Sequence, residues 1–179
     1  MLRRTVLLAM MMAGLSACMS SEPAAKVTPI PVGRVSVSLA ENASYGLLQS
    51  TQDPALAKSF SAKLGAALNA DAVTRGAANT AEVVVSRVTI QSGASRTVAA
   101  AESRVTGDVI VRDGSGKTLR RIDDVSFANK AARNTSTING LPIGALISMA
   151  NNAQNASPEK QISLLAQGFS KVIAGQLGR

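Results

Sequence analysis

The side chains that could carry out chemistry in this 179-residue chain are limited in kind. The sequence has no His, no Trp and one Cys, so a His-based catalytic triad, a His metal site and an intramolecular disulfide are impossible. A Ser nucleophile would need another base, and the G-x-S-x-G pattern of a nucleophile elbow does not occur. A Ser–Lys dyad would depend on two residues that meet in space, which spacing alone does not show. We therefore expect no enzymatic activity, no cofactor and no bound metal.

Polar residues gather in the segment Asp113-Gly114-Ser115-Gly116-Lys117-Thr118 and shortly after it. The ending GKT matches the last residues of a phosphate-binding loop, but that motif requires a Gly where Val111 stands and a helix after Thr118. The residues that follow, LRRIDDV, have a strand pattern, so the segment predicts a hairpin turn. Asp123 and Asp124 are adjacent carboxylates. Neighbours on a strand point to opposite faces, so we expect this pair to be solvated rather than to share a substrate.

Basic residues are frequent on both sides of the same hairpin. Cross-strand neighbours on one face of a sheet lie close together, so several of these side chains could gather on one face. The sequence therefore predicts a candidate surface for an anionic ligand, made of Arg96, Arg104, Arg112, Lys117, Arg120 and Arg121. The alternative is a solvated sheet face that binds nothing.

The single cysteine lies at the end of an N-terminal targeting segment. Two arginines precede an apolar run, Thr5 to Leu15, which has the length of a signal-peptide core and is too short to span a membrane as a helix. The next residues, Leu15-Ser16-Ala17-Cys18, resemble the lipobox of bacterial lipoproteins. The resemblance implies cleavage between Ala17 and Cys18 and acylation of Cys18, which gives a use to a lone thiol in an exported chain. The alternative is an ordinary secretory signal that contains a Cys.

Lipidation implies a location and a set of partners. Acyl chains on Cys18 would anchor the chain to a membrane. In bacterial lipoproteins an Asp directly after the acylated Cys tends to retain the protein in the inner membrane. Here that position is Met19, which implies the periplasmic side of the outer membrane. Loss of residues 1–17 removes two arginines, so the formal charge falls from +8 to +6. This charge could meet lipid phosphates, lipopolysaccharide or peptidoglycan carboxylates, or could be scattered and solvated. Nucleic acid is not expected, because four aromatic residues cannot build stacking platforms.

The remaining sequence predicts a tether and one domain. Residues 18–31 are rich in Ser, Ala and Pro, which is typical of a flexible tether, and residues 32–179 form the domain. Apolar alternation predicts strands over 34–39, 81–91, 96–112 and 117–127, the last three as an antiparallel meander. In the second of these strands we expect Val84, Val88 and Ile90 on one face and Val83 and Val85 on the other. The polar residues 41–52 predict a loop.

Two cap-plus-proline pairs, Asp53-Pro54 and Ser157-Pro158, predict the starts of amphipathic helices. The first would end near Ala70, and the second at Gly175 or Gly178. The apolar stretch Leu141–Ala153 predicts a further helix, either buried or covering a groove. The order β-α-β-β-β-α-α predicts an α+β fold, with a mostly antiparallel sheet of about four strands and helices packed on one face.

The domain also resembles small proteobacterial envelope lipoproteins of unknown function. The resemblance rests on Ala57-Lys58-Ser59-Phe60 and on the D-x-x-G-K turn from Asp113 to Lys117, and the α/β core is similar to that of curli-secretion-type lipoproteins. It implies no catalytic residue. We expect a membrane-anchored periplasmic lipoprotein that acts as a non-enzymatic binding or assembly module for an envelope protein, lipid or peptidoglycan. Two alternatives stay open: an accessory lipoprotein of an envelope lipid-transport system, with a groove beside Leu141–Ala150, and an envelope hydrolase.

Overall fold

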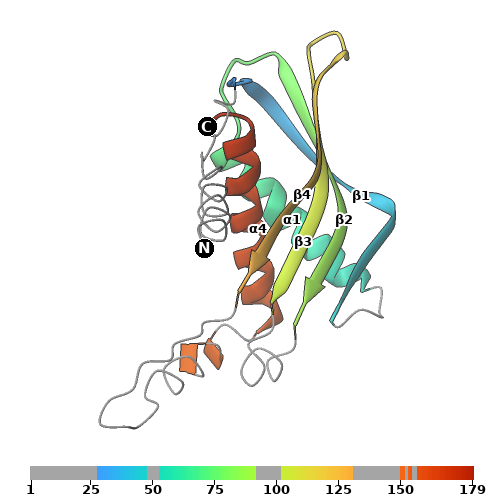
Figure 1. Cartoon of the computed structure of the whole chain (residues 1–179), viewed down its shortest axis with the longest axis vertical. Coiled ribbons are helices and arrows are strands. Elements are labelled where there is room, and N and C mark those ends of the chain that lie inside the picture. Colours follow the sequence, from blue (N-terminus) through green and yellow to red (C-terminus); the bar gives the residue numbers. More distant parts are fainter. Residues whose placement is uncertain (1–27, 48–52, 92–101, 131–149, 152, 155–156) are drawn as a thin grey trace, which may run out of the picture.

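The computed structural model describes residues 28–47, 53–91, 102–130, 150–151, 153–154 and 157–179. Its elements are β1 (Val32–Leu47), α1 (Pro54–Asp71), β2 (Asn79–Ile90), β3 (Ser103–Arg112), β4 (Thr118–Asn129) and α4 (Pro158–Gln176). Figure 1 shows one sheet with both of these helices against the same face. The predicted α+β architecture is confirmed. The predicted helix over 141–153 falls largely outside the described residues. The described residues in and just after this range, 150–151 and 153–154, are helical.

The sheet is mixed, with the strands in the order β1-β2-β3-β4. The pairings β2–β3 and β3–β4 are antiparallel and form the predicted meander. The pairing β1–β2 is parallel. Parallel neighbours need a crossover connection, and α1 supplies it. The expectation of a mostly antiparallel sheet is therefore confirmed, with one parallel pair at the β1 edge.

Both helices begin where the caps predict. The carboxylate of Asp53 accepts from the amides of Ala55 and Leu56 at 3.0 and 3.2 Å, and Pro54 follows at the first helical position. The hydroxyl of Ser157 accepts from the amide of Lys160 at 3.3 Å at the start of α4. These bonds satisfy amides that have no partner within the helix, so the boundaries are fixed locally.

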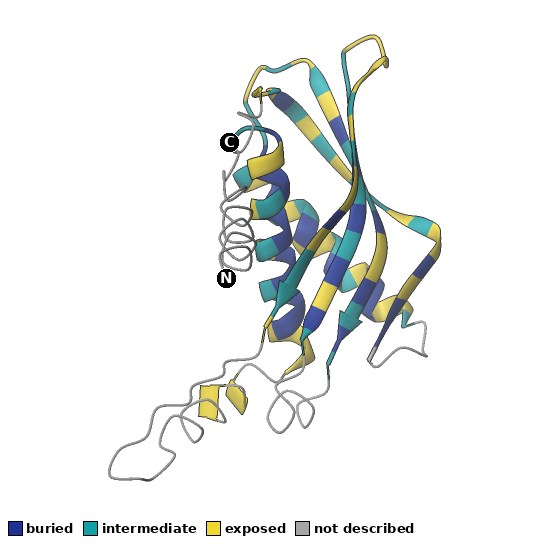
Figure 2. Cartoon of the chain, viewed as in Figure 1, coloured by how far each residue is buried: buried dark blue, intermediate teal, exposed yellow. Residues whose placement is uncertain are grey.

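The core lies between the sheet and the two helices, as Figure 2 shows in dark blue. Large side chains from α1 and α4 meet the covered face of the sheet. The fully buried ones include Phe60, Leu64, Leu68, Leu165, Phe169 and Ile173 from the helices and Val83, Val85, Val88, Ile90, Val105, Val109 and Val111 from the strands. The helices therefore depend on the sheet for burial of their apolar stripes.

The expected division of β2 into two faces was wrong. Val83, Val85, Val88 and Ile90 are all buried under the helices, whereas Val84 is only half-buried on the other face. The pairing with β3 shifts register between Val85 and Arg87, which indicates a β-bulge. A bulge inserts one residue and reverses the alternation beyond it, so apolar residues of both parities reach the core.

The expected loop over residues 41–52 was also wrong in its first half. β1 continues to Leu47, and Tyr45 pairs with Val88 of β2. Between the pairs Leu39–Val85 and Ser44–Arg87, β1 advances five residues while β2 advances two. The strand bends there (Figure 1), which lets polar residues lie within a strand without a regular alternation.

A buried polar group joins α4 to the end of the sheet. Ser103 of β3 and Gln161 of α4 are both fully buried. The Ser103 hydroxyl donates to the side-chain oxygen of Gln161 and accepts from the amide of Gln91 at 3.0 Å. The side-chain amide of Gln161 donates to the carbonyl of Gln91 at 2.9 Å. Buried polar groups need partners, so this network fixes where α4 meets β2 and β3.

Candidate binding surfaces

Three of the predicted site residues lie outside the described part of the chain. They are Ala17 and Cys18, the expected cleavage and lipidation residues, and Arg96, the first member of the predicted basic surface. The other five members of that surface are described, and the fold places them in different environments.

The open face of the sheet, which the helices do not cover, carries Arg104, Arg112 and Arg121. Arg104 and Arg112 lie eight residues apart on β3, or about 26 Å at the usual rise per residue. Arg104 pairs with Glu102 at 3.3 Å. Arg112 donates to the hydroxyl of Thr118 at 3.0 Å. These two cations therefore lie at opposite ends of the strand.

The other two members take separate positions. Lys117 lies exposed in the hairpin turn. Arg120 lies on the helix-covered side, where its guanidinium donates to the carbonyls of Thr28 and Gln176 at 3.0 Å each. Arg120 therefore joins the start of the domain to the end of α4, and it is not part of the open face.

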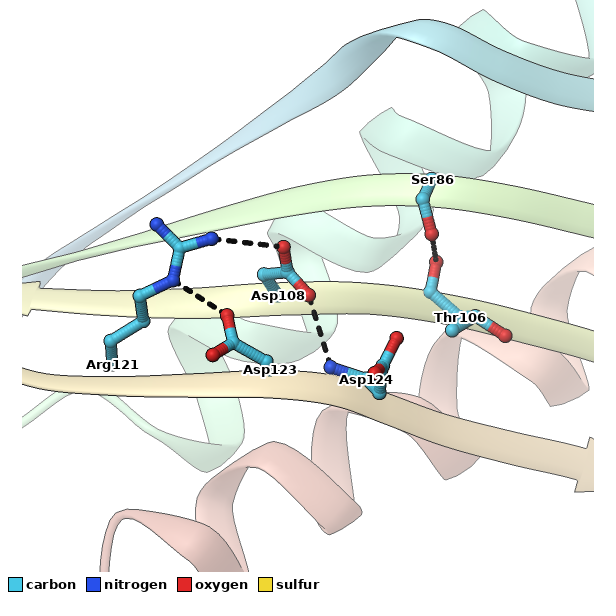
Figure 3. Close-up of polar contacts among 6 residues, drawn as sticks. All are labelled: Ser86, Thr106, Asp108, Arg121, Asp123 and Asp124. Carbon is cyan, nitrogen blue, oxygen red and sulfur yellow. Dashed lines mark hydrogen bonds and ion pairs between the residues drawn. The ribbon is translucent and has the colours of Figure 1, made fainter.

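Carboxylates flank the remaining arginine, Arg121, which lies on the open face of the edge strand β4. Figure 3 shows Arg121 between Asp108 of β3 and Asp123 of β4, at 3.5 and 2.6 Å. The hydrogen bond from Arg121 to the Asp123 carboxylate raises the pKa of the guanidinium. The carboxylate of Asp108 also accepts from the backbone amide of Asp124 at 3.0 Å. With one guanidinium and two carboxylates in contact with it, this cluster has a net negative charge and does not attract an anion.

A backbone irregularity brings the two adjacent aspartates to this cluster. Asp124 has a φ of 55°, and the β3–β4 pairing shifts register between Gly107 and Val109. The Asp123 side chain and the Asp124 main chain therefore both contact the cluster. Across the described ranges, no group of three His, Cys, Asp or Glu side chains is arranged to hold a metal ion.

The segment from Asp113 to Thr118 is the predicted hairpin turn. The amide of Asp113 donates to the carbonyl of Lys117 at 2.9 Å, and β4 rather than a helix follows. The Asp113 carboxylate accepts from the hydroxyl of Ser115 at 2.6 Å and from the amides of Ser115 and Lys117. These hydrogen bonds, that from the Ser115 hydroxyl above all, lower the pKa of Asp113. Because the carboxylate occupies the turn amides, they are not available to a phosphate.

A groove beside β1 is a feature that the sequence analysis missed. It has a volume of about 640 Å³ and lies between the edge strand and the start of α1. Its lining is Val37, Ser38, Leu39, Tyr45, Pro54, Ala57, Lys58 and Ser61. The side chain of Leu39 is 40% exposed, and the hydroxyl of Ser61 is buried with no hydrogen-bond partner in the described part of the structure. The sequence predicts a loop around Tyr45 and therefore does not place this residue on β1.

The outer edge of β1 lies next to this groove. Val32 and Val73 form a bridge, and the carbonyl of Val32 accepts from Thr74, so the start of the strand is covered. From Arg34 to Leu39, β1 pairs only with β2, and no other backbone hydrogen bond of the described chain reaches this edge. An unpaired edge can accept an added strand.

No helix in the described ranges is both long and apolar enough to cross a membrane. No protein-family model matches the chain, and a search of curated proteins finds no match. Two solved structures are among those that match the chain. One, described as a "putative lipoprotein" from Caulobacter crescentus CB15, is 18% identical with a TM-score of 0.30, over 66% of this chain and 83% of that one. The other, a PelC dodecamer from Paraburkholderia phytofirmans, is 14% identical with a TM-score of 0.32, over 74% and 92%. These values are too low to transfer a family or a function.

Proposed function

We propose that the chain is a bacterial envelope lipoprotein, anchored through Cys18 on the periplasmic side of the outer membrane, whose domain holds a partner protein without chemistry of its own. The location is supported by the signal segment and by Leu15-Ser16-Ala17-Cys18. The binding role is supported by one observation, the open edge of β1 from Arg34 to Leu39 with an apolar groove beside it.

The chemistry of this edge favours an extended protein segment as the partner. An added strand satisfies unpaired backbone donors and acceptors along its whole length and places alternate side chains in the groove. A lipid tail would fill the groove and leave the backbone groups unpaired. The exposed Leu39 offers an apolar contact to such a segment.

The opposite edge of the sheet fits this role less well. β4 carries the Asp124 irregularity and the charged pair of Arg121 and Asp123. Charges and bulges are the usual protection of an edge strand against pairing. The first part of β1, by contrast, alternates Val and Ser and has one charged residue, Arg34. We therefore assign the partner to β1.

Site-specific crosslinking in cells tests the binding role. A photo-reactive residue replaces Lys58, which lines the groove, and Leu39→Lys puts a charge at the edge. We expect a discrete protein adduct that Leu39→Lys reduces at least tenfold, which corresponds to about 1.4 kcal/mol. The matched control is Leu119→Lys on the open face, because Leu119 is the other exposed large apolar residue of the described ranges, at 47%. If no adduct forms, or if Leu39→Lys and Leu119→Lys give equal adducts, the assignment of a protein partner to β1 is refuted. Adducts to lipid or glycan alone would favour the transport or cell-wall alternative.

Membrane fractionation tests the location. We expect the wild-type chain in the outer-membrane fraction and a Cys18→Ser chain in the soluble fraction, because the acyl chains supply the anchor. If Cys18→Ser fractionates like the wild type, the lipidation proposal is wrong.

A further inference from the structure

The described chain begins at one end of the domain, where it is held against the end of α4. The amide of Ile30 donates to the carbonyl of Leu177 at 3.0 Å, and Arg120 binds the carbonyl of Thr28. Figure 1 shows the start of β1, the end of α4 and the β3–β4 hairpin at this end. We call it the tether end. If Cys18 is acylated, nine residues lie between it and Thr28, and the ten Cα–Cα steps keep the tether end within about 35 Å of the membrane surface.

Basic residues from four parts of the chain meet at the tether end. The register across the sheet places Arg34 of β1 and Arg112 of β3 on either side of Thr80, about 10 Å apart. Lys117 lies in the adjoining hairpin, and Arg75 in the turn after α1. Together with Arg120 and Arg179, which bind backbone carbonyls of the same end, they make six cations.

Few carboxylate side chains balance these cations. Asp71, Glu82 and Asp113 lie at the tether end, and all three are already engaged, with Ser170 at 2.8 Å, with Ser38 at 3.4 Å and with the hairpin turn. In the rest of the described chain eight basic residues stand against seven acidic ones. Most of the charge excess of the described domain therefore lies at the tether end.

We propose that the tether end is a docking surface for the phosphate groups of the bilayer that carries the anchor. This inference rests on the proposed lipid anchor and goes beyond it, because it fixes which end of the domain faces the membrane. Basic residues near an anionic bilayer add to acyl anchoring, each by about a fivefold factor. Docking of the tether end leaves the groove beside β1 on the side wall of the domain, open to a partner.

The three cations Arg34, Arg75 and Lys117 are suited to a test, because their side chains are exposed and contribute no hydrogen bond or ion pair to the described structure. The variant Arg34→Gln/Arg75→Gln/Lys117→Gln removes them together. A matched control, Lys58→Gln/Lys63→Gln/Lys171→Gln, removes the same charge from three exposed lysines of α1 and α4. The two variants have equal net charge and differ only in where it is lost.

The readout is the distance of two labels from the bilayer in reconstituted, lipidated full-length protein. The chain has one cysteine, and acylation would occupy it, so an introduced thiol is labelled alone. Ala78→Cys places a fluorophore at the tether end, and Ala55→Cys places it at the start of α1, at the other end of the domain. Vesicles contain phosphatidylcholine with or without 30% phosphatidylglycerol, and a headgroup-linked quencher.

We expect strong quenching of the label at residue 78, and little at residue 55, in phosphatidylglycerol vesicles at low salt. Loss of the three tether-end cations should lower the docked-to-undocked ratio about a hundredfold, the product of three fivefold factors, and the control should keep it. Salt at 1 M should abolish the quenching, because the Debye length falls to about 3 Å. Quenching that is independent of lipid charge, or that is lost equally in the control, would overturn the proposal. A chain that does not float with vesicles at all would instead refute the lipid anchor.

Discussion

The buried network of Ser103, Gln161 and Gln91 makes a quantitative prediction about coupling between two side chains. Ser103→Ala removes the donor to the side-chain oxygen of Gln161 and the acceptor of the Gln91 amide. Gln161→Leu removes the acceptor of the Ser103 hydroxyl hydrogen and the donor to the carbonyl of Gln91. The groups of Ser103 and Gln161 are fully buried, whereas Gln91 is half-buried and accessible to water in part.

The expected free energies follow from counting the stranded groups. At about 2 kcal/mol for a fully buried group and about 1 kcal/mol for a half-buried one, each single variant loses about 3 kcal/mol of unfolding free energy. Within this network the double variant strands the two Gln91 backbone groups and should lose about 2 kcal/mol, against about 6 kcal/mol if the effects were additive. The double variant should therefore be at least as stable as either single variant.

Urea unfolding followed by far-ultraviolet circular dichroism measures these differences, because the chain has no Trp for fluorescence. Ser170→Ala is the matched control: Ser170 is equally buried, but its partner Asp71 is half-exposed and can bind water instead. The control should cost no more than about 1 kcal/mol. Additive losses in the double variant, or an equal cost for Ser170→Ala and Ser103→Ala, would refute the reasoning.

Three further predictions concern backbone contacts and charge. Gly107→Ala should lower the unfolding free energy by about 1–3 kcal/mol in the same urea assay, because the new Cβ would lie 2.6 Å from a carbonyl oxygen of β2. Gly65→Ala should raise it by about 1 kcal/mol, because Gly65 is helical and no atom lies within 4 Å of the new Cβ. The hydrogen bonds to the Asp113 carboxylate stabilise the hairpin at pH values above the ordinary carboxyl pKa, and this stabilisation is lost as the pH falls through the lowered pKa of Asp113. An NMR titration should therefore give Asp113 a midpoint below 3.8, and a midpoint at or above 3.8 would contradict the turn geometry. Arg120→Gln should speed exchange of the Ile30 amide, which donates to the carbonyl of Leu177, roughly fivefold, at about 1 kcal/mol, and exposed Arg121→Gln should not.

Elements with signals inside a few consecutive residues were predictable. The helix starts at Pro54 and Pro158 follow from a cap side chain and a proline that act within one turn. The hairpin from Asp113 to Lys117 follows from its own glycines and from a carboxylate that binds nearby amides. Such elements need no knowledge of the rest of the chain.

Elements that depend on a neighbouring strand were not predictable. The burial of Val83 and Val88 on the same face requires the bulge in β2, and that bulge arises opposite Gly107, where the absence of a Cβ permits close approach to β2. The extension of β1 to Leu47 requires pairing with β2, since its own residues do not alternate regularly between apolar and polar. The groove beside β1 depends on both, so no pattern in the sequence indicates it.

The position of the excess positive charge in the fold was also not predictable from sequence patterns. A sequence gives a net charge of +8, and the position of that charge depends on contacts between residues far apart in the chain. Arg34 and Arg112 become neighbours through two strand pairings, and Arg179 reaches the same end through the carbonyl of Val73. Like charges within about 10 Å repel one another at physiological ionic strength, so charges that served solubility alone would be better dispersed. Repulsion of this kind is relieved by an external counter-charge, and the anionic surface next to the proposed anchor supplies one.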